Sequence, residues 1–281
     1  MDRQGFIDFN LRFSSENSGK ASSYAQAIKI LDEVLPHQGT IDLHGKSLYD
    51  IHDVALIEEL LRFVKAEVKK MKQNEPNIFD DYGNPNQRSY PLRSFCSAAL
   101  KSLKQYAEYE MQVTVADRIV AEENNPKKIS EKLITHFDIN KEGEDKVSQT
   151  KIRKGQDYFR RMILANYGGR CALTGIDIPQ LLLASHIIPW SDKSHKKDRL
   201  NPCNGICLSA LYDKAFDQGL ITFSSDDYSV ILSSALHEYK TQEYFDKYFG
   251  RIAGQKIDAP KNYAPNCDFL DYHHDHVFLG K

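Results

Sequence analysis

Apolar residues recur at helical spacing in three segments of the first 111 residues. The first segment opens on Ser22 and Ser23, residue types that commonly cap a helix N-terminus, and Pro36 stops it. The second segment follows Asp53, another capping residue, and the third starts near Phe95. Three amphipathic helices with short connections predict a small helical domain at the N-terminus.

The next stretch, residues 112–150, is polar, charged and poor in aromatic residues. This composition favours a linker around one short helix at residues 129–137. We therefore expect three parts: a helical domain over residues 1–111, the linker, and a second domain over residues 151–281.

Residues 155–175 predict a helix followed by a short strand. The glycines of "NYGGR" suit the C-terminal end of the helix, and "CALTG", residues 171–175, suits a short strand closed by a turn. Arg160 and Arg161 point away from the most apolar stripe of the helix, so at least one of them is free to meet solvent or phosphate. That stripe consists of Tyr158, Phe159, Met162, Ile163 and Leu164.

The following segment alternates between apolar runs and a polar loop. "LLLASHI", residues 181–187, predicts a strand that carries His186, and Pro189 then blocks further ladder pairing. After a basic loop that contains Asn204, "GICLS", residues 205–209, predicts a second strand. The pattern is therefore strand, loop, strand, and a helix follows directly.

That helix is predicted over residues 210–217, with Leu211 and Ala215 on its core-facing stripe. Asp213 and Asp217 are four residues apart, which stacks both carboxylates on one helical face.

The distribution of charge along the chain says more about possible binding partners than the net charge does. The whole chain carries a net charge of −2, yet residues 151–215 hold eleven Lys or Arg against five Asp and no Glu. This segment is therefore at +6, and the rest of the chain is at −8. A basic segment in an acidic protein suits local attraction to a polyanion, although a solvated basic surface without a partner gives the same pattern.

Composition excludes several classes of protein. Apolar residues make up 41% of the chain and charged residues 27%, as in an ordinary globular protein. No apolar run approaches the roughly 20 residues of a membrane helix, and the N-terminus lacks the apolar core of a signal peptide. Five scattered cysteines do not make a disulfide framework, so we expect a cytoplasmic protein with reduced thiols.

Strand, loop, strand and helix, with a histidine ending the first strand, an asparagine in the loop and an acid on the helix, resemble the HNH nuclease motif. Residues 153–223 are similar to the HNH domains of restriction endonucleases, through "CALTG", "ASHIIPW" and "LNPCNGICLSALYDKAFDQGLITF". The tail "NCDFLDYHHDHVF" also resembles the ending of those proteins. The resemblance implies an α+β fold, in which a ββα-metal nuclease domain with flanking helices follows the helical domain.

The resemblance also implies a role for each polar residue. His186 would be the general base, since an imidazole near its reference pKa of about 6.5 accepts a proton at neutral pH. Asn204 would brace the loop and orient the histidine. Asp213 would supply a hard oxygen to Mg²⁺ or Mn²⁺, and Asp217 a second ligand or a hold on metal-bound water. Ser185 stands where many such nucleases have a metal-ligating Asp or His, so we expect few protein ligands in the metal shell.

Six cations are candidates for contacts with DNA phosphates. Four lie in the loop between the histidine and the asparagine, where they would flank the scissile phosphate, and two lie on the preceding helix. They are Lys193, Lys196, Lys197, Arg199, Arg160 and Arg161.

The resulting hypothesis is a metal-dependent endonuclease that hydrolyses double-stranded DNA to 5′-phosphate and 3′-hydroxyl ends, most simply a bacterial restriction enzyme. Cutting both strands needs two sites, so a homodimer is expected. The alternatives are a modification-dependent, phage or homing nuclease, and a catalytically silent DNA-binding protein that keeps the fold. The helical domain would serve either DNA binding or dimerisation.

Two further clusters suggest metals less strongly. Cys203 and Cys207 are spaced CxxxC, and the chain has no CxxC pair, so structural zinc is not expected. Near the end stand His273, His274 and His276. We expect one of these histidines to pack back on the domain rather than a metal cluster.

Overall fold

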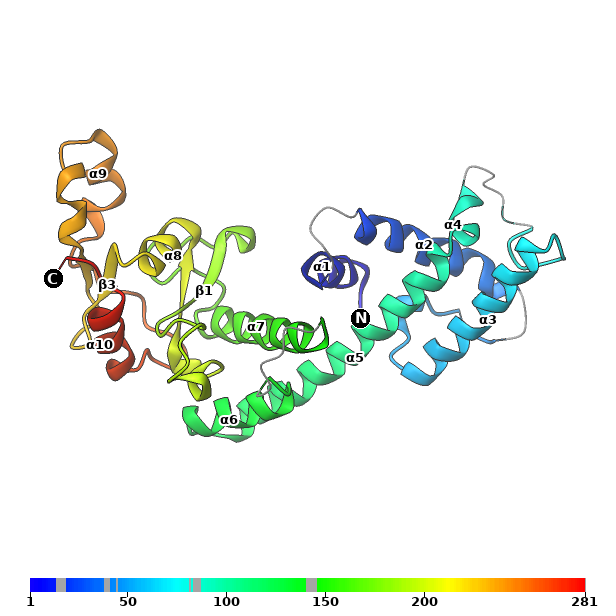
Figure 1. Ribbon diagram of the computed structural model, residues 1–281, viewed down its shortest axis with the longest axis horizontal. Coiled ribbons are helices and arrows are strands. Elements are labelled where there is room, and N and C mark those ends of the chain that lie inside the picture. The colour runs from blue at the N-terminus through cyan, green and yellow to red at the C-terminus, as the bar shows by residue number, and fades with distance from the viewer. Residues whose placement is uncertain are drawn as a thin grey trace. The chain divides into compact units, whose positions relative to one another are not determined.

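The computed structural model describes residues 1–13, 19–37, 41–43, 45–80, 82, 87–139 and 146–280. The chain divides into two compact units, Met1–Val115 and Ala116–Lys281 (Figure 1). Each unit is described by itself below.

Unit 1 is helical. Its core includes the aromatic side chains of the first helix, where the ring of Phe9 lies 5.3 Å from that of Tyr106. The predicted cap at Asp53 is confirmed, because its carboxylate accepts the backbone N–H groups of Ala55 and Leu56. The helices are α1 (Arg3–Phe13), α2 (Lys20–Val34), α3 (Val54–Lys72), the short α4 (Ser89–Leu92) and α5 (Phe95–Glu122), which continues into unit 2; 3-10 turns are η1 (Leu35–His37) and η2 (Leu48–Asp50).

The expected start of α2 is wrong by about one turn. Gly19, in the left-handed region at φ 55°, precedes the helix, and no side chain caps it. Ser22 therefore lies inside the first turn, where its hydroxyl donates to the Gly19 carbonyl at 3.0 Å. The helix starts early because Ala21 is already buried in the core.

Unit 2 combines helices with two small antiparallel sheets, which makes the chain α+β. Its helices are α6 (Pro126–His136), α7 (Lys146–Asn166), α8 (Ala210–Asp217), α9 (Glu243–Tyr248) and α10 (Cys267–His276); its strands are β1 (Leu182–His186), β2 (Gly205–Ser209), β3 (Ile221–Phe223) and β4 (Val230–Leu232); short 3-10 turns are η4 (Pro179–Leu181), η5 (Lys196–Asp198), η6 (Pro202–Asn204), η7 (Ser234–Tyr239) and η8 (Gly250–Ile252). The predicted strands β1 and β2 and helices α7 and α8 are confirmed.

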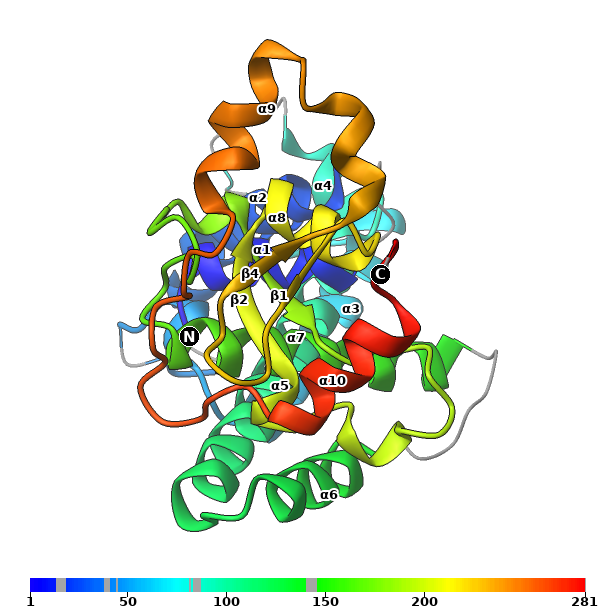
Figure 2. The same cartoon turned by 90° about the vertical axis from the view of Figure 1, so that its left-hand side faces the viewer.

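The β1–β2 pair is the framework of the site. The strands run antiparallel with His186 opposite Gly205, and α7 lies behind them in Figure 2. A Cβ atom at Gly205 would stand 2.7 Å from side-chain atoms of Phe159 and Ile163 on α7. Glycine therefore lets α7 lie directly against β2, at the level of the histidine.

Two local expectations in this unit are wrong. Residues 171–174 form a turn and no strand, because the Gly175 N–H bonds back to the Cys171 carbonyl at 2.9 Å. Leu211 is 45% exposed, whereas Tyr212 and Phe216 are buried with Ala215. The phase of α8 is fixed by these aromatic rings rather than by Leu211.

The segment expected to be a linker contains more helix than its composition suggests. Residues 112–122 continue α5, and the predicted short helix is present as α6. Ser130 of α6 is fully buried; its hydroxyl donates to the Lys197 carbonyl at 2.6 Å and accepts from the Leu200 N–H at 3.2 Å. The functional division at residues 111 and 150 stays a prediction.

Within the described ranges, none of the helices is both long and apolar enough to cross a membrane.

Candidate active site

The end of β1 places two adjacent polar side chains against different helices. Successive residues of a strand point to opposite faces. Ser185 contacts α8 through Asp213, and His186 contacts α7 through the ring of Phe159. The chain then leaves the sheet at Pro189. Two chemically different groups therefore flank one strand end.

The His186 ring is held by stacking and by one hydrogen bond. It lies parallel to Phe159, with ring centroids 3.9 Å apart and planes at 14°, and Trp190 meets it edge-on at 5.5 Å. Its Nε2 is 3.0 Å from the carbonyl oxygen of Arg199. A carbonyl only accepts, so Nε2 carries the proton and Nδ1 carries the lone pair.

The second ring nitrogen of His186 keeps its lone pair available. No described residue forms a hydrogen bond to Nδ1, and the ring is half-buried. Among the described side chains, the buried N or O atoms without a partner are the hydroxyls of Tyr49 and Tyr167. Nδ1 is therefore not sealed in the protein, and solvent reaches it.

The expectation that His186 titrates near its reference value is wrong. Burial lowers its pKa to about 4, and the positive charge of Arg199 lowers it too, while the hydrogen bond to the Arg199 carbonyl acts in the opposite direction. The imidazole is therefore neutral at pH 7, the state in which it accepts a proton.

On the other face, Ser185 and Asp213 form a short hydrogen bond. The Ser185 hydroxyl, which is buried, donates to Asp213 Oδ1 at 2.6 Å. Asp217 lies one turn further along α8. Partial burial of its carboxyl, and then the charge of Asp213, raise the pKa of Asp217. The two predicted metal ligands are thus electrostatic neighbours.

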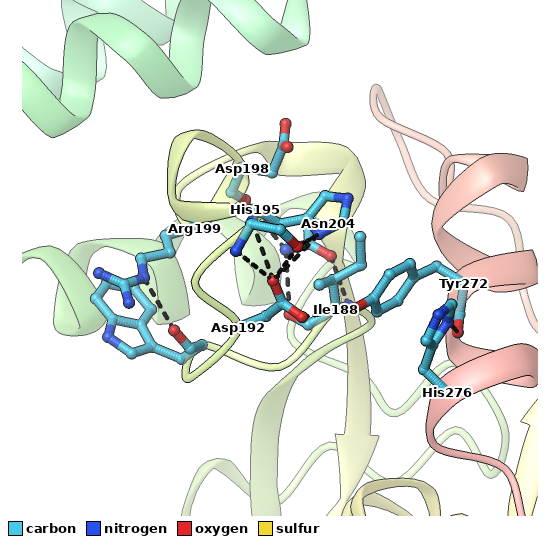
Figure 3. Close-up of polar contacts among 10 residues, drawn as sticks. Ile188, Asp192, His195, Asp198, Arg199, Asn204, Tyr272 and His276 are labelled. Carbon is cyan, nitrogen blue, oxygen red and sulfur yellow. Dashed lines mark hydrogen bonds and ion pairs between the residues drawn. The ribbon is translucent and has the colours of Figure 1, made fainter.

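Asn204 braces the loop and does not contact the reacting groups. It is 2% exposed. Its Oδ1 accepts the Ile188 N–H at 2.8 Å, and its Nδ2 donates to the Asp198 carbonyl at 3.0 Å (Figure 3). It thereby closes both ends of the loop, residues 187–204, which we call the site loop.

Three of the six candidate cations are engaged within the protein. Arg160 donates to the carbonyls of Pro179 and Leu182, at the start of β1. Arg161 forms an ion pair with Asp157 at 3.3 Å. Arg199 is only 9% exposed: its Nε donates to the Trp190 carbonyl at 2.9 Å, and its guanidinium carbon lies 5.2 Å from the centre of the tryptophan ring.

The other three candidate cations are exposed on the site loop. Lys193, Lys196 and Lys197 all present their side chains to solvent. The sequence alone does not distinguish the six cations. In the structure the three lysines lie exposed on the site loop, and the three arginines make the contacts described above, Arg161 while it stays exposed to solvent.

A contact between the site loop and α10 was not anticipated from the sequence. Asp192 Oδ2 accepts the Tyr272 hydroxyl at 2.5 Å, and its Oδ1 accepts the hydroxyl and N–H of Ser194 (Figure 3). These hydrogen bonds, from Ser194 first and Tyr272 second, hold the pKa of Asp192 well below its usual range. The two residues are 80 positions apart in the sequence, so no local sequence pattern predicts the contact.

One histidine of the cluster at the end of the chain packs on the domain, as predicted. His273 is 1% exposed and stacks on Phe216 with centroids 3.8 Å apart. Its Nε2 faces the Phe216 carbonyl at 3.2 Å, and its Nδ1 lies 2.9 Å from the Thr222 hydroxyl. This histidine packs back on the domain.

The oxygen atoms on the α8 face are of the type that a hard divalent cation prefers. Asp213, Asp217 and Ser185 supply two carboxylates and a hydroxyl, and Mg²⁺ and Mn²⁺ prefer oxygen ligands. Burial raises the pKa of Asp217 most and the charge of Asp213 adds to it, and a cation would offset this second contribution. Across the described residues, no group of three or more His, Cys, Asp or Glu side chains is arranged to hold a metal ion.

A protein-family model matches the part of the chain that carries the site. Residues 171–224 match the family model HNH_2, described as HNH endonuclease. The matched segment begins at the turn before β1 and ends just after β3, so it contains the strand end, the site loop and α8. A search of curated proteins finds no match.

Proposed function

The chain carries an HNH endonuclease domain over residues 171–224, and from that premise we propose that it is a metal-dependent nuclease that hydrolyses double-stranded DNA. One observation carries the proposal. A histidine with a free, neutral Nδ1 and a carboxylate–hydroxyl pair flank the same strand end. We place the scissile phosphate over that end, between His186 and Asp213.

His186 acts as the general base. Its Nδ1 accepts a proton from the attacking water, because the Arg199 carbonyl holds the proton of the ring on Nε2. Stacking on Phe159 fixes the plane of the ring, so the lone pair has one direction. Because the pKa of His186 is low, the neutral base form dominates at neutral pH. The same low pKa makes the imidazole a weaker base than an ordinary histidine.

Asp213 and Asp217, one turn apart on α8, would hold the Mg²⁺ or Mn²⁺ ion. When bound, the ion supplies Lewis-acid stabilisation of the phosphate and of the leaving 3′ oxygen. The hydroxyl of Ser185 already orients Asp213 Oδ1, so it acts as a positioning group for the carboxylate. The products are 5′-phosphate and 3′-hydroxyl ends.

The site loop supplies contacts to the DNA backbone. Lys193, Lys196 and Lys197 are exposed, and cations at such positions gain affinity by releasing counterions. Arg160, Arg161 and Arg199 take structural roles first, because each already has a partner inside the protein. Asn204 is a positioning residue, since its contacts are with the loop backbone.

We assign the protein to restriction, acting as a homodimer, on the resemblance of residues 153–223 to restriction endonucleases. Two sites are needed to cut both strands. The competing candidate is a catalytically silent DNA-binding protein, which the neutral base and the paired carboxylate at one strand end disfavour.

The test is incubation of wild type and Asp213→Asn with unmethylated and methylated phage DNA, in Mg²⁺, Mn²⁺ or EDTA. Wild type should release discrete fragments in either metal, and DNA ligase alone should rejoin them. Asp213→Asn should bind DNA in EDTA as wild type does and release no fragments. Folded wild type that binds DNA but cuts none of these substrates would leave only the binding protein.

A further inference from the structure

The site loop is fastened from outside the segment that matches the family model. Tyr272 belongs to α10 (Cys267–His276), more than forty residues after that segment ends. Its hydroxyl donates to Asp192 Oδ2 at 2.5 Å, which is the short end of the range for a phenol and a carboxylate. Asp192 lies three residues after Pro189, in the first part of the loop.

Asp192 connects this anchor to the residues that follow it. Its Oδ1 accepts Ser194 N at 2.8 Å, Ser194 Oγ at 2.6 Å and His195 N at 3.1 Å. One carboxylate therefore fixes the backbone on both sides of Lys193 and joins it to α10 (Figure 3). The loop cannot move at this point without breaking a charge-assisted hydrogen bond.

Aromatic packing restrains the anchor itself. The ring of Tyr272 stacks on His276 with centroids 4.0 Å apart, and His195 meets it edge-on at 4.7 Å. The hydroxyl is thus presented in one direction by a ring held on two sides, as Figure 3 shows for the labelled residues. A tyrosine that only filled space would not need its hydroxyl aimed at a carboxylate.

We infer that Tyr272 and Asp192 are positioning residues that preorganise the cationic site loop for DNA. This inference rests on the proposed function. A fixed loop presents Lys193, Lys196 and Lys197 as one set, so DNA binding does not have to order them. Without the Tyr272–Asp192 hydrogen bond, the same lysines would contact the same phosphates. Binding would then have to order the loop, and the lost conformational entropy would lower the affinity.

The experiment separates the number of phosphate contacts from the ordering of the loop. Affinity for a short DNA duplex is measured in EDTA by fluorescence anisotropy over a range of salt concentrations. The slope of log affinity against log salt reports how many phosphates are contacted, at about 0.9 per contact. Tyr272→Phe should weaken binding about fivefold and leave the slope unchanged. Lys193→Gln/Lys197→Gln should weaken binding and lower the slope by about 2.

The matched control is Tyr263→Phe, which deletes a hydroxyl in the same unit that donates to the Val120 carbonyl at 3.3 Å rather than to Asp192. It should bind DNA as wild type does. Asp192→Asn should weaken binding at least as much as Tyr272→Phe, because it also weakens the hydrogen bonds to Ser194 and His195. Adding Tyr272→Phe to it should change binding little, since the Tyr272–Asp192 link is already weakened.

The outcomes distinguish the two levels of the proposal. If the lysine variant loses affinity but Tyr272→Phe binds like the control, the anchor has no positioning role and the nuclease proposal stands. If Tyr272→Phe lowers the slope, the tyrosine changes the number of contacts and the inference is wrong. If wild type does not bind DNA, both the proposed function and the inference fall.

Discussion

Two histidines in unit 2 have nearly the same surroundings but differ in what contacts their Nδ1 atom. His186 stacks on Phe159 at 3.9 Å and His273 on Phe216 at 3.8 Å; each points Nε2 at a backbone carbonyl. Burial lowers the pKa of each to about 4. They differ at Nδ1, which meets the Thr222 hydroxyl in His273 and solvent in His186. A stacked ring with a low pKa therefore does not distinguish the two histidines, and the proposed role of His186 as general base depends on its free Nδ1.

The largest expected effect is on cleavage. His186→Ala should reduce the rate of DNA cleavage by about 10²- to 10⁴-fold, the usual range for loss of a general base. His273→Ala should leave the rate per folded molecule unchanged, because both of its ring nitrogens are already used. The measurement is the cleavage rate at saturating Mg²⁺, scaled to the folded fraction from circular dichroism.

Equal rate losses in the two variants would contradict the comparison, since a buried histidine of the core would then matter as much as the proposed base. DNA binding in EDTA serves as the control, and both folded variants should retain it.

The second effect is on stability, and here His273→Ala should have the larger effect of the two variants. His273→Ala should lower the free energy of unfolding by about 3 kcal/mol, because it empties a site 1% exposed and strips a buried hydroxyl of its partner. His186→Ala should cost less, since its half-buried ring leaves a space that water enters. Urea unfolding of both variants measures the two losses of unfolding free energy. A larger loss for His186→Ala than for His273→Ala would contradict the prediction that His273 contributes more to the stability of the fold.

A smaller effect should appear in mild acid. Unfolded histidine titrates near about 6.5, and both rings titrate at about 4 when folded. Between these values the unfolded state binds more protons, so stability is full above the upper value and falls as the pH drops toward the lower one. His273 should contribute about 1.4 kcal/mol per pH unit, and half-buried His186 less.

Urea unfolding at several pH values between neutral and about 5 measures that slope. His273→Gln should remove the larger part of it. An unchanged slope in that variant would mean that other groups control the acid response.

The smallest expected effect is that of Thr222→Val. The change keeps the shape of the side chain and leaves His273 Nδ1 without a partner in the core, so unfolding should become easier by about 1 kcal/mol. Cleavage should be unchanged. Wild-type stability in this variant would show that the hydroxyl contributes nothing to holding the ring.

The local pattern of the sequence predicted the frame of the site well. Two apolar runs separated by a polar loop, followed by apolar residues at helical spacing, were enough for β1, β2 and α8. The family resemblance rested on the intervals from His186 to Asn204 and from Asn204 to Asp213, together with "CALTG" and the "FDQGL" tail. These features lie within short windows, where the periodicity of side chains determines the element.

What the sequence could not predict depends on contacts between distant residues. Arg199 is a loop cation in the sequence, and only the fold shows it buried over Trp190. The pKa of His186 departs from its reference value because α7 brings Phe159 against the ring. Leu211 was expected inside, but packing of Phe216 turns α8 so that it faces solvent.

The hydroxyl of Ser130 has a consequence for the autonomy of the matched domain. Leu200 is fully buried, and its backbone N–H finds its hydrogen-bond partner on α6, forty residues before the match to the family begins. A chain starting at residue 171 would leave that amide unpaired in the interior, at about 1–3 kcal/mol, and would also lack the ring beneath His186. We therefore expect the smallest independently folding nuclease of this protein to begin before Asn125, well upstream of the motif by which it is recognised.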